Sequence, residues 1–331
     1  MFVPLFIVAL LVAYKTNVSL KVLSSTWSSG TLAGKPGVVA FGQQVAAIGA
    51  FERSANYFLV IWPALVFGIL IASSVRAFVS PQWIARVLGE RSMKTQISAG
   101  LAGAPLMLCS CCVAPVFTSV VEGSGRLGPA ISLMLSSPSL NPAAITLTFM
   151  LFQSPIAAGR LAAALAAVLF IGPLTERLMK GSVAIRPLAA RASAAPDESA
   201  AMRFLRSLGV VSVRTLPGVV LGVFASMLLV QFLPAAVFTS PGARIAAVLI
   251  LATIAVPLAL PTFLEIPLSL GLLAAGFPAG AAVALLFAGP AINLPSLWSI
   301  ARISGWRVAL LVAASVWSIA VLGGLVAGSL L

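Results

Sequence analysis

The sequence predicts an all-α integral membrane protein built as an inverted-repeat bundle, and three observations support this fold class. Only 8% of the 331 residues are charged and 60% are hydrophobic, and the mean hydropathy is +1.12. Apolar runs of about 20 residues recur along the chain, which matches a hydrocarbon core about 30 Å thick. Proline-containing motifs recur in the same register in the two halves of the chain.

This composition excludes several classes of protein. A soluble domain carries about 25% charged residues, so this chain could not cover a water-facing surface of its size. The net charge of +13 would suggest nucleic acid in a soluble protein, but here it indicates Lys and Arg gathered in cytoplasmic loops. We therefore expect the lipid bilayer, and no nucleic acid, as a partner. With no His and three Cys, all within Cys109–Cys112, we expect no disulfide framework, resident zinc or other cofactor.

Residues 1–52 predict an N-terminal membrane helix that ends near Lys15, followed by a loop and an interfacial helix. The start lacks a positive segment and a cleavage site, so we do not expect a cleaved signal peptide. The other apolar blocks are residues 54–79, 95–122, 128–152, 155–178, 207–233, 244–275, 278–300 and 305–330. Together the blocks predict about seven to nine membrane helices.

The chain divides into two similar halves. A basic segment rich in Ala, Pro and Ser, residues 179–203, predicts a cytoplasmic linker between a first membrane repeat, 53–178, and a second, 204–331. An offset of 152 residues aligns Pro115 with Pro267, Gly128 with Gly280, Pro138 with Pro290 and Asn141 with Asn293. Because internal repeats are a signature of secondary transporter folds, we expect a transporter-like bundle.

The distribution of charge predicts how the halves are oriented. We interpret 95–122 and 244–275 as proline-broken re-entrant hairpins, each of which enters and leaves the membrane on the same side, since neither leg is long enough to cross alone. The loops that then share one side carry 12 of the 20 Lys and Arg residues, and they are 80–94, 123–127, 176–206 and 300–307. Each half then has three crossings, so the repeats are inverted and the positive-inside rule is satisfied.

Four apolar blocks are interrupted by motifs that a lipid-facing helix would not keep. They read LCSCCVAP (108–115), SSPSLNP (136–142), LPTFLEIP (260–267) and AGPAINLP (288–295). Proline removes a backbone donor, and unpaired backbone is tolerated at membrane depth only where protein or water covers it. We expect the four breaks to meet near the midplane in a substrate site, with simple helix kinks as the alternative.

The motifs resemble those of the YraQ/ArsP-type predicted permease family. The residues that carry the resemblance are Cys109, Ser110, Cys111, Pro115, Pro138, Asn141, Pro290 and Asn293. The resemblance covers about 53–328 and implies an inner-membrane permease, in a family where some members export trivalent organoarsenicals. Cys112 departs from the pattern, because a small residue such as Gly is expected there. The resemblance implies a permease more strongly than an arsenic substrate.

The thiols of Cys109, Cys111 and Cys112 have three interpretations. They could pack as small buried hydrophobic side chains. They could bind a soft species such as Cu(I) or trivalent arsenic, because thiolates select soft ions. They could also exchange with the sulfur of a substrate, although their CxxC spacing lacks the βαβ context of redox proteins.

Two asparagines and one glutamate are further candidates. Asn141 and Asn293 each lie at a break, where an amide could satisfy freed backbone groups or coordinate a solute. Glu265 lies in a broken membrane segment, where an ionisable group indicates function and burial favours the neutral form that a proton carrier needs. The alternative is a structural partner among the membrane arginines Arg160, Arg214 and Arg244. We expect Glu122, in contrast, to form a local surface ion pair with Arg126.

We therefore predict a multi-pass permease of the bacterial inner membrane, not an enzyme, that moves a small thiophilic or sulfur-containing solute. The chain has no P-loop, so transport would be secondary, with proton exchange at Glu265. The alternatives are a membrane-embedded thiol redox protein that works with a partner, and a passive channel. A homo-oligomer is compatible with the sequence.

Overall fold

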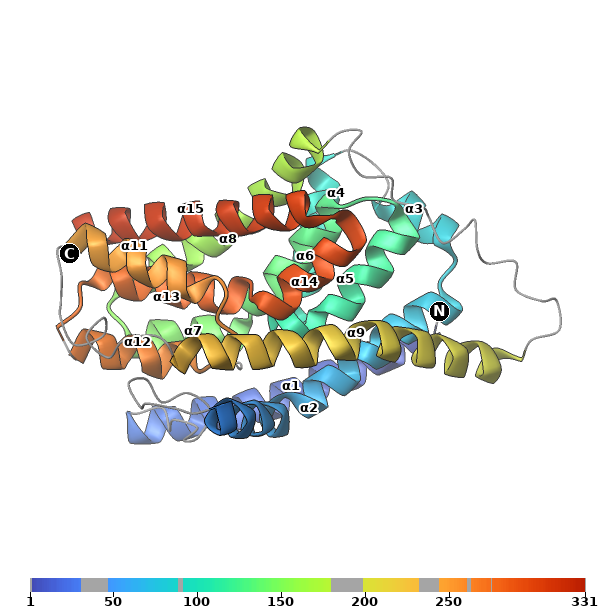
Figure 1. The fold of residues 1–331 in the computed structure, drawn as a ribbon, viewed down its shortest axis with the longest axis horizontal. Coiled ribbons are helices and arrows are strands. Elements are labelled where there is room, and N and C mark those ends of the chain that lie inside the picture. The colour runs from blue at the N-terminus through green and yellow to red at the C-terminus, as the bar shows by residue number, and fades with distance from the viewer. Residues whose placement is uncertain are drawn as a thin grey trace.

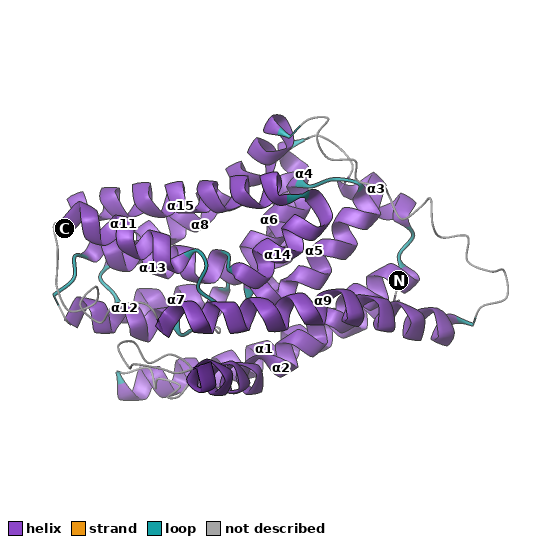
Figure 2. Ribbon diagram, viewed as in Figure 1, coloured by secondary structure: helices purple, strands orange, loops and turns teal. Residues whose placement is uncertain are grey.

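The computed structural model describes residues 2–30, 47–88, 92–179, 199–231, 244–260, 263–274 and 276–330. Every regular element in these ranges is a helix (Figure 2), which confirms the all-α prediction. The first half contains α1 (Phe2–Ser29), α2 (Ala47–Phe78), α3 (Pro81–Leu88), α4 (Met93–Gly103), the 3-10 helix η1 (Ala104–Leu106), α5 (Ser110–Ser124), α6 (Gly128–Ser139), α7 (Pro142–Leu151) and α8 (Ser154–Leu178). The second half contains α9 (Ala200–Gln231), α11 (Arg244–Ala255), α12 (Glu265–Ala274), α13 (Ala279–Ala291), α14 (Leu294–Ser304) and α15 (Trp306–Ser329).

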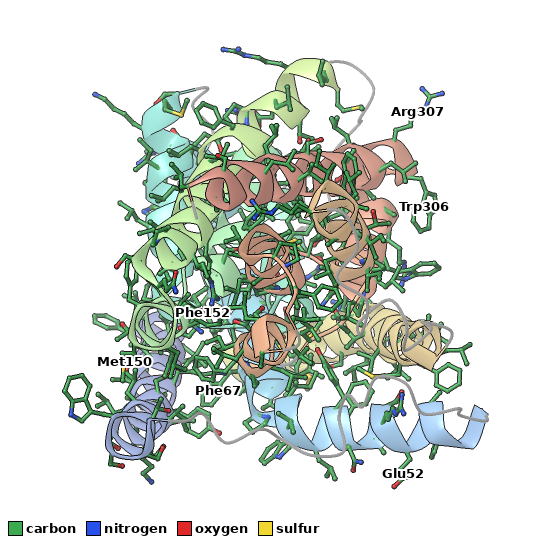
Figure 3. All side chains as sticks on the ribbon, turned by 90° about the vertical axis from the view of Figure 1, so that its left-hand side faces the viewer. Glu52, Phe67, Met150, Phe152, Trp306 and Arg307 are labelled. Carbon is green, nitrogen blue, oxygen red and sulfur yellow. The ribbon has the colours of Figure 1, made fainter. Side chains whose placement is uncertain are left out.

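The helices pack in two groups (Figure 1). α1, α2 and α9 lie along one side, with both α1 and α9 packed on α2. In the other group, α8 packs against α4, α6, α13 and α15, so it contacts helices of both halves. Charged side chains such as Glu52 and Arg307 are exposed and point away from the bundle (Figure 3), whereas the interior is almost entirely apolar.

Five of the described helices, α1, α2, α8, α9 and α15, are long and apolar enough to cross a membrane. α13 and α14 together make a sixth candidate, bent by 50°. Fewer single helices qualify than the seven to nine predicted, because the proline breaks divide the block 128–152 into α6 and α7 and the block 244–275 into α11 and α12. Each of these pieces is too short to cross alone. The chain is nevertheless a multi-pass helical membrane protein.

The N-terminal segment differs from the prediction. α1 does not end near Lys15 but continues to Ser29, because Lys is a good helix former and its long side chain can keep the charge at a polar edge. The predicted interfacial segment falls largely in residues 31–46, outside the described residues, and α2 already begins at Ala47. Most of the predicted linker 179–203 also lies outside the described residues.

The segments 95–122 and 244–275 both fold as hairpins whose two ends lie together. Ser92 and Met93, at the start of α4, line one pocket with Arg126, which follows α5. Arg244, at the start of α11, lines another pocket with Pro278, which follows α12. Each hairpin is interrupted at its tip, by η1 in the first and, in the second, by a stretch after α11 whose described residues 256–260 and 263–264 are not helical.

These two pockets are equivalent under the offset of 152 residues. The first pocket is lined by Ser92, Met93, Gln96, Arg126, Pro173, Glu176 and Arg177. The residue 152 positions after each of these lines the second pocket, namely Arg244, Ile245, Val248, Pro278, Leu325, Gly328 and Ser329. α8 and α15 run antiparallel, because Pro155 at the start of α8 and Leu330 at the end of α15 share one groove. The pockets therefore lie at opposite ends, and the repeats are inverted.

Close backbone contacts between glycines also recur at this offset. A Cβ atom on Gly172 of α8 would lie 2.6 Å from the carbonyl oxygen of Gly128 in α6. A Cβ atom on Gly324 of α15 would likewise lie 2.6 Å from the carbonyl oxygen of Gly280 in α13. The equivalent helix pairs, α6 with α8 and α13 with α15, are thus in close contact in both halves.

We expect Gly172→Ala and Gly324→Ala each to lower the free energy of unfolding by about 1–3 kcal/mol, the usual cost of overpacking. Gly271→Ala in α12 is the control, since no atom lies within 4 Å of its Cβ position. That change should be neutral or stabilise the helix by up to about 1 kcal/mol. Unfolding in detergent measures all three variants, and equal losses in the three would contradict the repeated close contact.

Basic residues gather at one end of the bundle, as the charge pattern predicts. Lys94 lies in the first turn of α4, and Arg126 and Arg177 line the pocket at that end. Arg307 lies in the first turn of α15, which runs antiparallel to α8 and so starts where α8 ends. This end has the charge of a cytoplasmic face.

The predicted ion pair between Glu122 and Arg126 is wrong. Glu122 instead bonds to Arg76 of α2 at 2.7 Å and to Arg214 of α9 at 2.9 Å. Arg126 pairs with Glu176 at the end of α8. The reason is the left-handed turn at Gly125, which lies between Glu122 and Arg126 in the sequence. This turn directs the chain from α5 toward α6 and α8.

Candidate functional site

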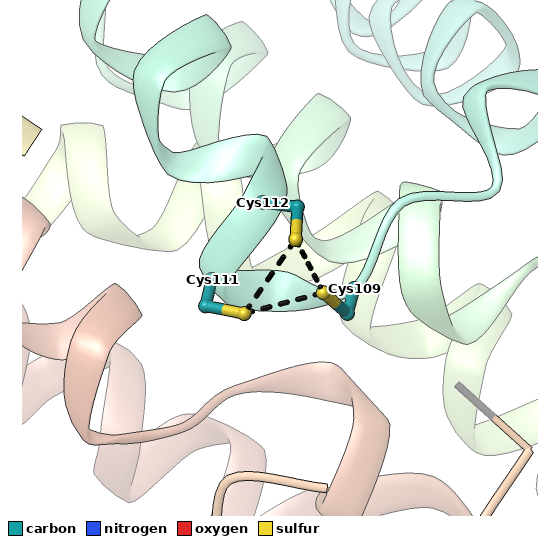
Figure 4. Close-up of side chains that lie close together, drawn as sticks. All are labelled: Cys109, Cys111 and Cys112. Carbon is teal, nitrogen blue, oxygen red and sulfur yellow. Dashed lines mark hydrogen bonds between the residues drawn. The ribbon is translucent and has the colours of Figure 1, made fainter. Parts of the chain in front are cut away.

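The three thiols lie together at the start of α5 (Figure 4). Met107 has a left-handed φ of 49°, which interrupts the helical backbone between η1 and α5. α5 then begins at Ser110, so the thiols surround its first turn. The Sγ atom of Cys109 is 2.8 Å from that of Cys112 and 3.2 Å from that of Cys111, and the latter two are 3.8 Å apart. All three are free and buried.

α2 packs directly on this thiol cluster, which we define as Cys109, Cys111 and Cys112. The hydroxyl of Tyr57 lies 3.4 Å from Sγ of Cys111. One residue of α2 must be glycine, because a Cβ atom on Gly68 would lie 2.2 Å from the carbonyl oxygen of Cys112. Pro115 is buried in the same turn region of α5. The backbone that carries the thiols is thus held against α2.

α1 approaches the same break from outside the repeated bundle. The hydroxyl of Ser19 donates to Sδ of Met107 at 3.9 Å. Lys15 lies one turn earlier on α1 and therefore on the same face of that helix as Ser19. Sequence reasoning missed Tyr57 as a neighbour of the thiols, because no local signal marks it.

The other two predicted motifs form matching helix breaks. Pro138 and Pro290 lie in the last turns of α6 and α13. Asn141 then caps α7, where its Oδ1 accepts a backbone N–H at 3.0 Å, and Asn293 caps α14 in the same way at 3.0 Å. Both asparagines therefore satisfy freed backbone donors. Nδ2 of Asn293 is buried with no hydrogen-bond partner within the described ranges.

Glu265 begins α12 and is paired with an arginine. It is 2% exposed, and its Oε1 accepts from Nη2 of Arg160, which is 1% exposed, at 2.9 Å. Arg160 also donates to Thr148 of α7. Of the three arginines considered as partners, Arg214 instead bonds to Glu122 and Arg244 is exposed at the far pocket.

The breaks of the two halves meet inside the bundle. α5, which carries the thiols, packs on α14, and α6 packs on α13. The N–H of Leu294 donates to the carbonyl of Pro257 at 3.3 Å, which joins the α13–α14 break to the break of the second hairpin. Within the described residues no contact connects Glu265 with the thiols, so the candidate site residues form two separate polar groups. One is a thiol cluster in the first half, and the other is an ion pair between the halves.

Inverted halves, proline-broken hairpins and buried polar groups at the breaks define a membrane permease of the transporter class. The comparisons with known proteins agree. The chain belongs to the ArsP_1 family, which is described as a predicted permease and matches residues 47–329. α1 thus precedes the part that the family shares.

Three curated relatives are similar to the chain. UPF0718 protein YraQ of Escherichia coli is 28% identical over 252 residues, which are 75% of this chain and 72% of that protein. UPF0718 protein MJ0584 of Methanocaldococcus jannaschii is 28% identical over 98 residues, 29% of this chain and 27% of that protein. UPF0718 protein YcgR of Bacillus subtilis is 24% identical over 127 residues, 38% of this chain and 43% of that protein. No solved structure matches the chain.

Proposed function

We propose that this permease is a secondary transporter that moves a small thiophilic or sulfur-containing solute through a site at its broken helices. The observation that carries the proposal is the buried thiol cluster, because the three sulfur atoms all lie within 4.8 Å of one another. Three converging thiols at a helix break present a soft ligand set to the interior.

The number of sulfur atoms supports a three-coordinate centre. Three sulfurs in a plane around an ion at about 2.3 Å would be ~4.0 Å apart. The separations of 2.8, 3.2 and 3.8 Å are shorter, so the thiols would move apart slightly to hold an ion between them. Zinc fits less well, since it takes four ligands in closed sites and the described residues bring no fourth Cys, His or carboxylate to the cluster.

The other breaks would complete the solute path. Oδ1 of Asn293 is used by the helix cap, which leaves its buried Nδ2 available to a solute. The residues that we propose to contact or position the solute are Cys109, Ser110, Cys111, Cys112, Pro115, Pro138, Asn141, Glu265, Pro290 and Asn293. The prolines act by opening the backbone, and the asparagines act by holding the helix starts in place.

Proton coupling is proposed at Glu265. Among the acidic residues that the structure describes, Glu265 is the one with a fully buried side chain. A carboxylate at membrane depth is energetically costly, which indicates a functional role. Oε1 of Glu265 accepts from Arg160, so in this proposal proton binding at Glu265 accompanies the opening of that pair.

We further propose that the protein resides in a bacterial inner membrane with its basic end in the cytoplasm. The two hairpins would then re-enter the bilayer from opposite faces. The repeat units would be residues 53–178 and 204–331, joined by the cytoplasmic linker 179–203, with residues 1–52 as an added N-terminal segment.

Flux of a thiophilic solute into proteoliposomes tests this proposal. We expect arsenite flux in wild type to increase with an imposed pH gradient, Cys111→Ala to abolish the flux, and Glu265→Gln to remove its response to the gradient. Ser119→Ala is the control, because Ser119 is buried in α5 but bonds to the carbonyl of Ala72 in α2 and not to the thiols. Flux unchanged by Cys111→Ala would refute the thiol path.

A thiol redox function is the second candidate, and one observation favours it. The shortest sulfur separation, 2.8 Å, joins the pair with CxxC spacing, Cys109 and Cys112. Oxidation of this pair to a disulfide in wild type, with turnover by a thiol reductant and no solute flux, would favour the redox function over transport.

A further inference from the structure

The buried pair of Arg160 and Glu265 leaves part of its hydrogen-bonding capacity unused. Oε2 of Glu265 and Nε of Arg160 are buried and have no partner within the described ranges. Ser269, one turn after Glu265 on α12, is fully buried and its hydroxyl is also without a partner there. Polar groups in this state are costly, so the site has the donors and acceptors to take a polar ligand.

The repeat shows that the fold does not need these polar residues. Under the offset of 152, the polar set Arg160, Thr148, Glu265 and Ser269 corresponds to Val312, Ile300, Val113 and Phe117. All four counterparts are apolar and at most 1% exposed. The same architecture is therefore packed with hydrocarbon at one position and with an ion pair at the other.

An ion pair at such a place is retained for a reason other than stability. Replacing a buried ion pair by well-packed apolar residues is often neutral or stabilising by about 1–4 kcal/mol. Because α5 and α15 carry valines, Val113 and Val312, at the equivalent positions, the pair between α8 and α12 points to function.

We propose that Arg160 is a binding site for a small monovalent anion and that Glu265 takes up one proton when the anion binds. The anion replaces the Glu265 carboxylate on the guanidinium, and a proton from water bonds to the released carboxylate. The net charge of the site is zero before and after, so no uncompensated charge is left in the bilayer. This inference rests on the proposed proton coupling at Glu265 and goes beyond the proposed function, because it adds an anion that binds at Arg160 together with the proton.

Within the described residues, no helix that packs on α8 or α12 brings another charge to this pair. The helices that pack on α8 or α12 include α6, α7 and α13, which carry no charged or titratable side chain. The remaining charges on α4, α8 and α15 are Lys94, Glu176, Arg177 and Arg307. They lie at the basic end, and Glu176 is about 24 Å from Arg160 along α8 at 1.5 Å per residue.

The test is anion binding and proton uptake by the purified full-length protein in detergent. The probes are chloride, thiocyanate and methanesulfonate. In wild type we expect at least one of them to bind saturably, with uptake of about one proton per anion and an affinity that rises about tenfold for each unit of pH decrease. Saturable binding without proton uptake, or no saturable binding of any of the three, would overturn the proposal.

Two variants sharpen this test. Glu265→Gln imitates the protonated carboxyl, so we expect it to bind the anion at pH 8 at least tenfold more tightly than wild type and without pH dependence. Glu176→Gln is the matched control, since it removes the carboxylate from the other ion pair of α8 and should behave as wild type. Weaker anion binding in Glu265→Gln would refute the exchange. If the anion binds with its proton but the cysteine variants still transport arsenite, the thiol mechanism is refuted and the anion site is not.

Discussion

Arsenite binding is expected to fall at least about 100-fold when any one of Cys109, Cys111 or Cys112 is replaced by alanine. Arsenite, As(OH)3, condenses with three thiols to form three As–S bonds and release three molecules of water. Removing one thiol leaves arsenic with one oxygen ligand in place of sulfur. Loss of an outer-shell partner already lowers metal affinity about 10–100-fold, and loss of a direct ligand lowers it further.

A second probe separates a three-thiol site from a two-thiol site. Phenylarsine oxide needs only two thiols, so its affinity should stay within about tenfold when one thiol is missing, as long as the remaining two can converge. The assay has no background from other cysteines, because the chain contains three in all. Equilibrium dialysis in detergent measures both probes, with Ser119→Ala as the control on the same helix. Arsenite affinity unaffected by Cys111→Ala would reduce the site to two thiols.

Replacing Arg160 and Glu265 together by valine is expected to restore the stability that either single replacement removes. Each single variant leaves one buried charge without its partner, which lowers the free energy of unfolding by about 3–5 kcal/mol. The double variant reproduces the valines found at the equivalent positions, Val312 and Val113, and should lie within about 1 kcal/mol of wild type. It should also lose anion binding and proton-driven flux.

Unfolding by denaturant in detergent measures these stabilities. The control is the pair of Arg126 and Glu176, whose side chains are 12% and 19% exposed. Their replacement, singly or together, should change the stability by about 1 kcal/mol or less, because partly hydrated ion pairs contribute little. If the double valine variant lost as much stability as the two single variants together, the ion pair would be needed for packing, and apolar residues could not replace it.

Features that depend on short-range pattern could be predicted from the sequence. Proline and glycine act on their own turn of backbone, so Pro138 and Pro290 mark real breaks and the offset of 152 residues continues into the pocket-lining residues of α8 and α15. Lys15 was misjudged by the same local reasoning, since a single charge does not end a helix whose other residues favour it. The thiols were predicted to lie close because they are close in sequence, and the helix start does bring them together.

Contacts between distant elements depended on the tertiary structure. Three arginines were equally available to Glu265 by composition, and only the packing of α8 across α7 and α13 selects Arg160. Glu122 was assigned the nearest basic residue in sequence, whereas the turn at Gly125 gives it partners on α2 and α9.

The sequence by itself thus determined the class of protein, the duplication and the places where helices break, because hydropathy and backbone chemistry are properties of each segment. The tertiary structure alone decided which side chains share the interior, including Tyr57 with the thiols and Arg160 with Glu265. A few buried polar groups in an apolar chain must find partners wherever the packing of the helices brings them, and that packing is a property of the whole chain.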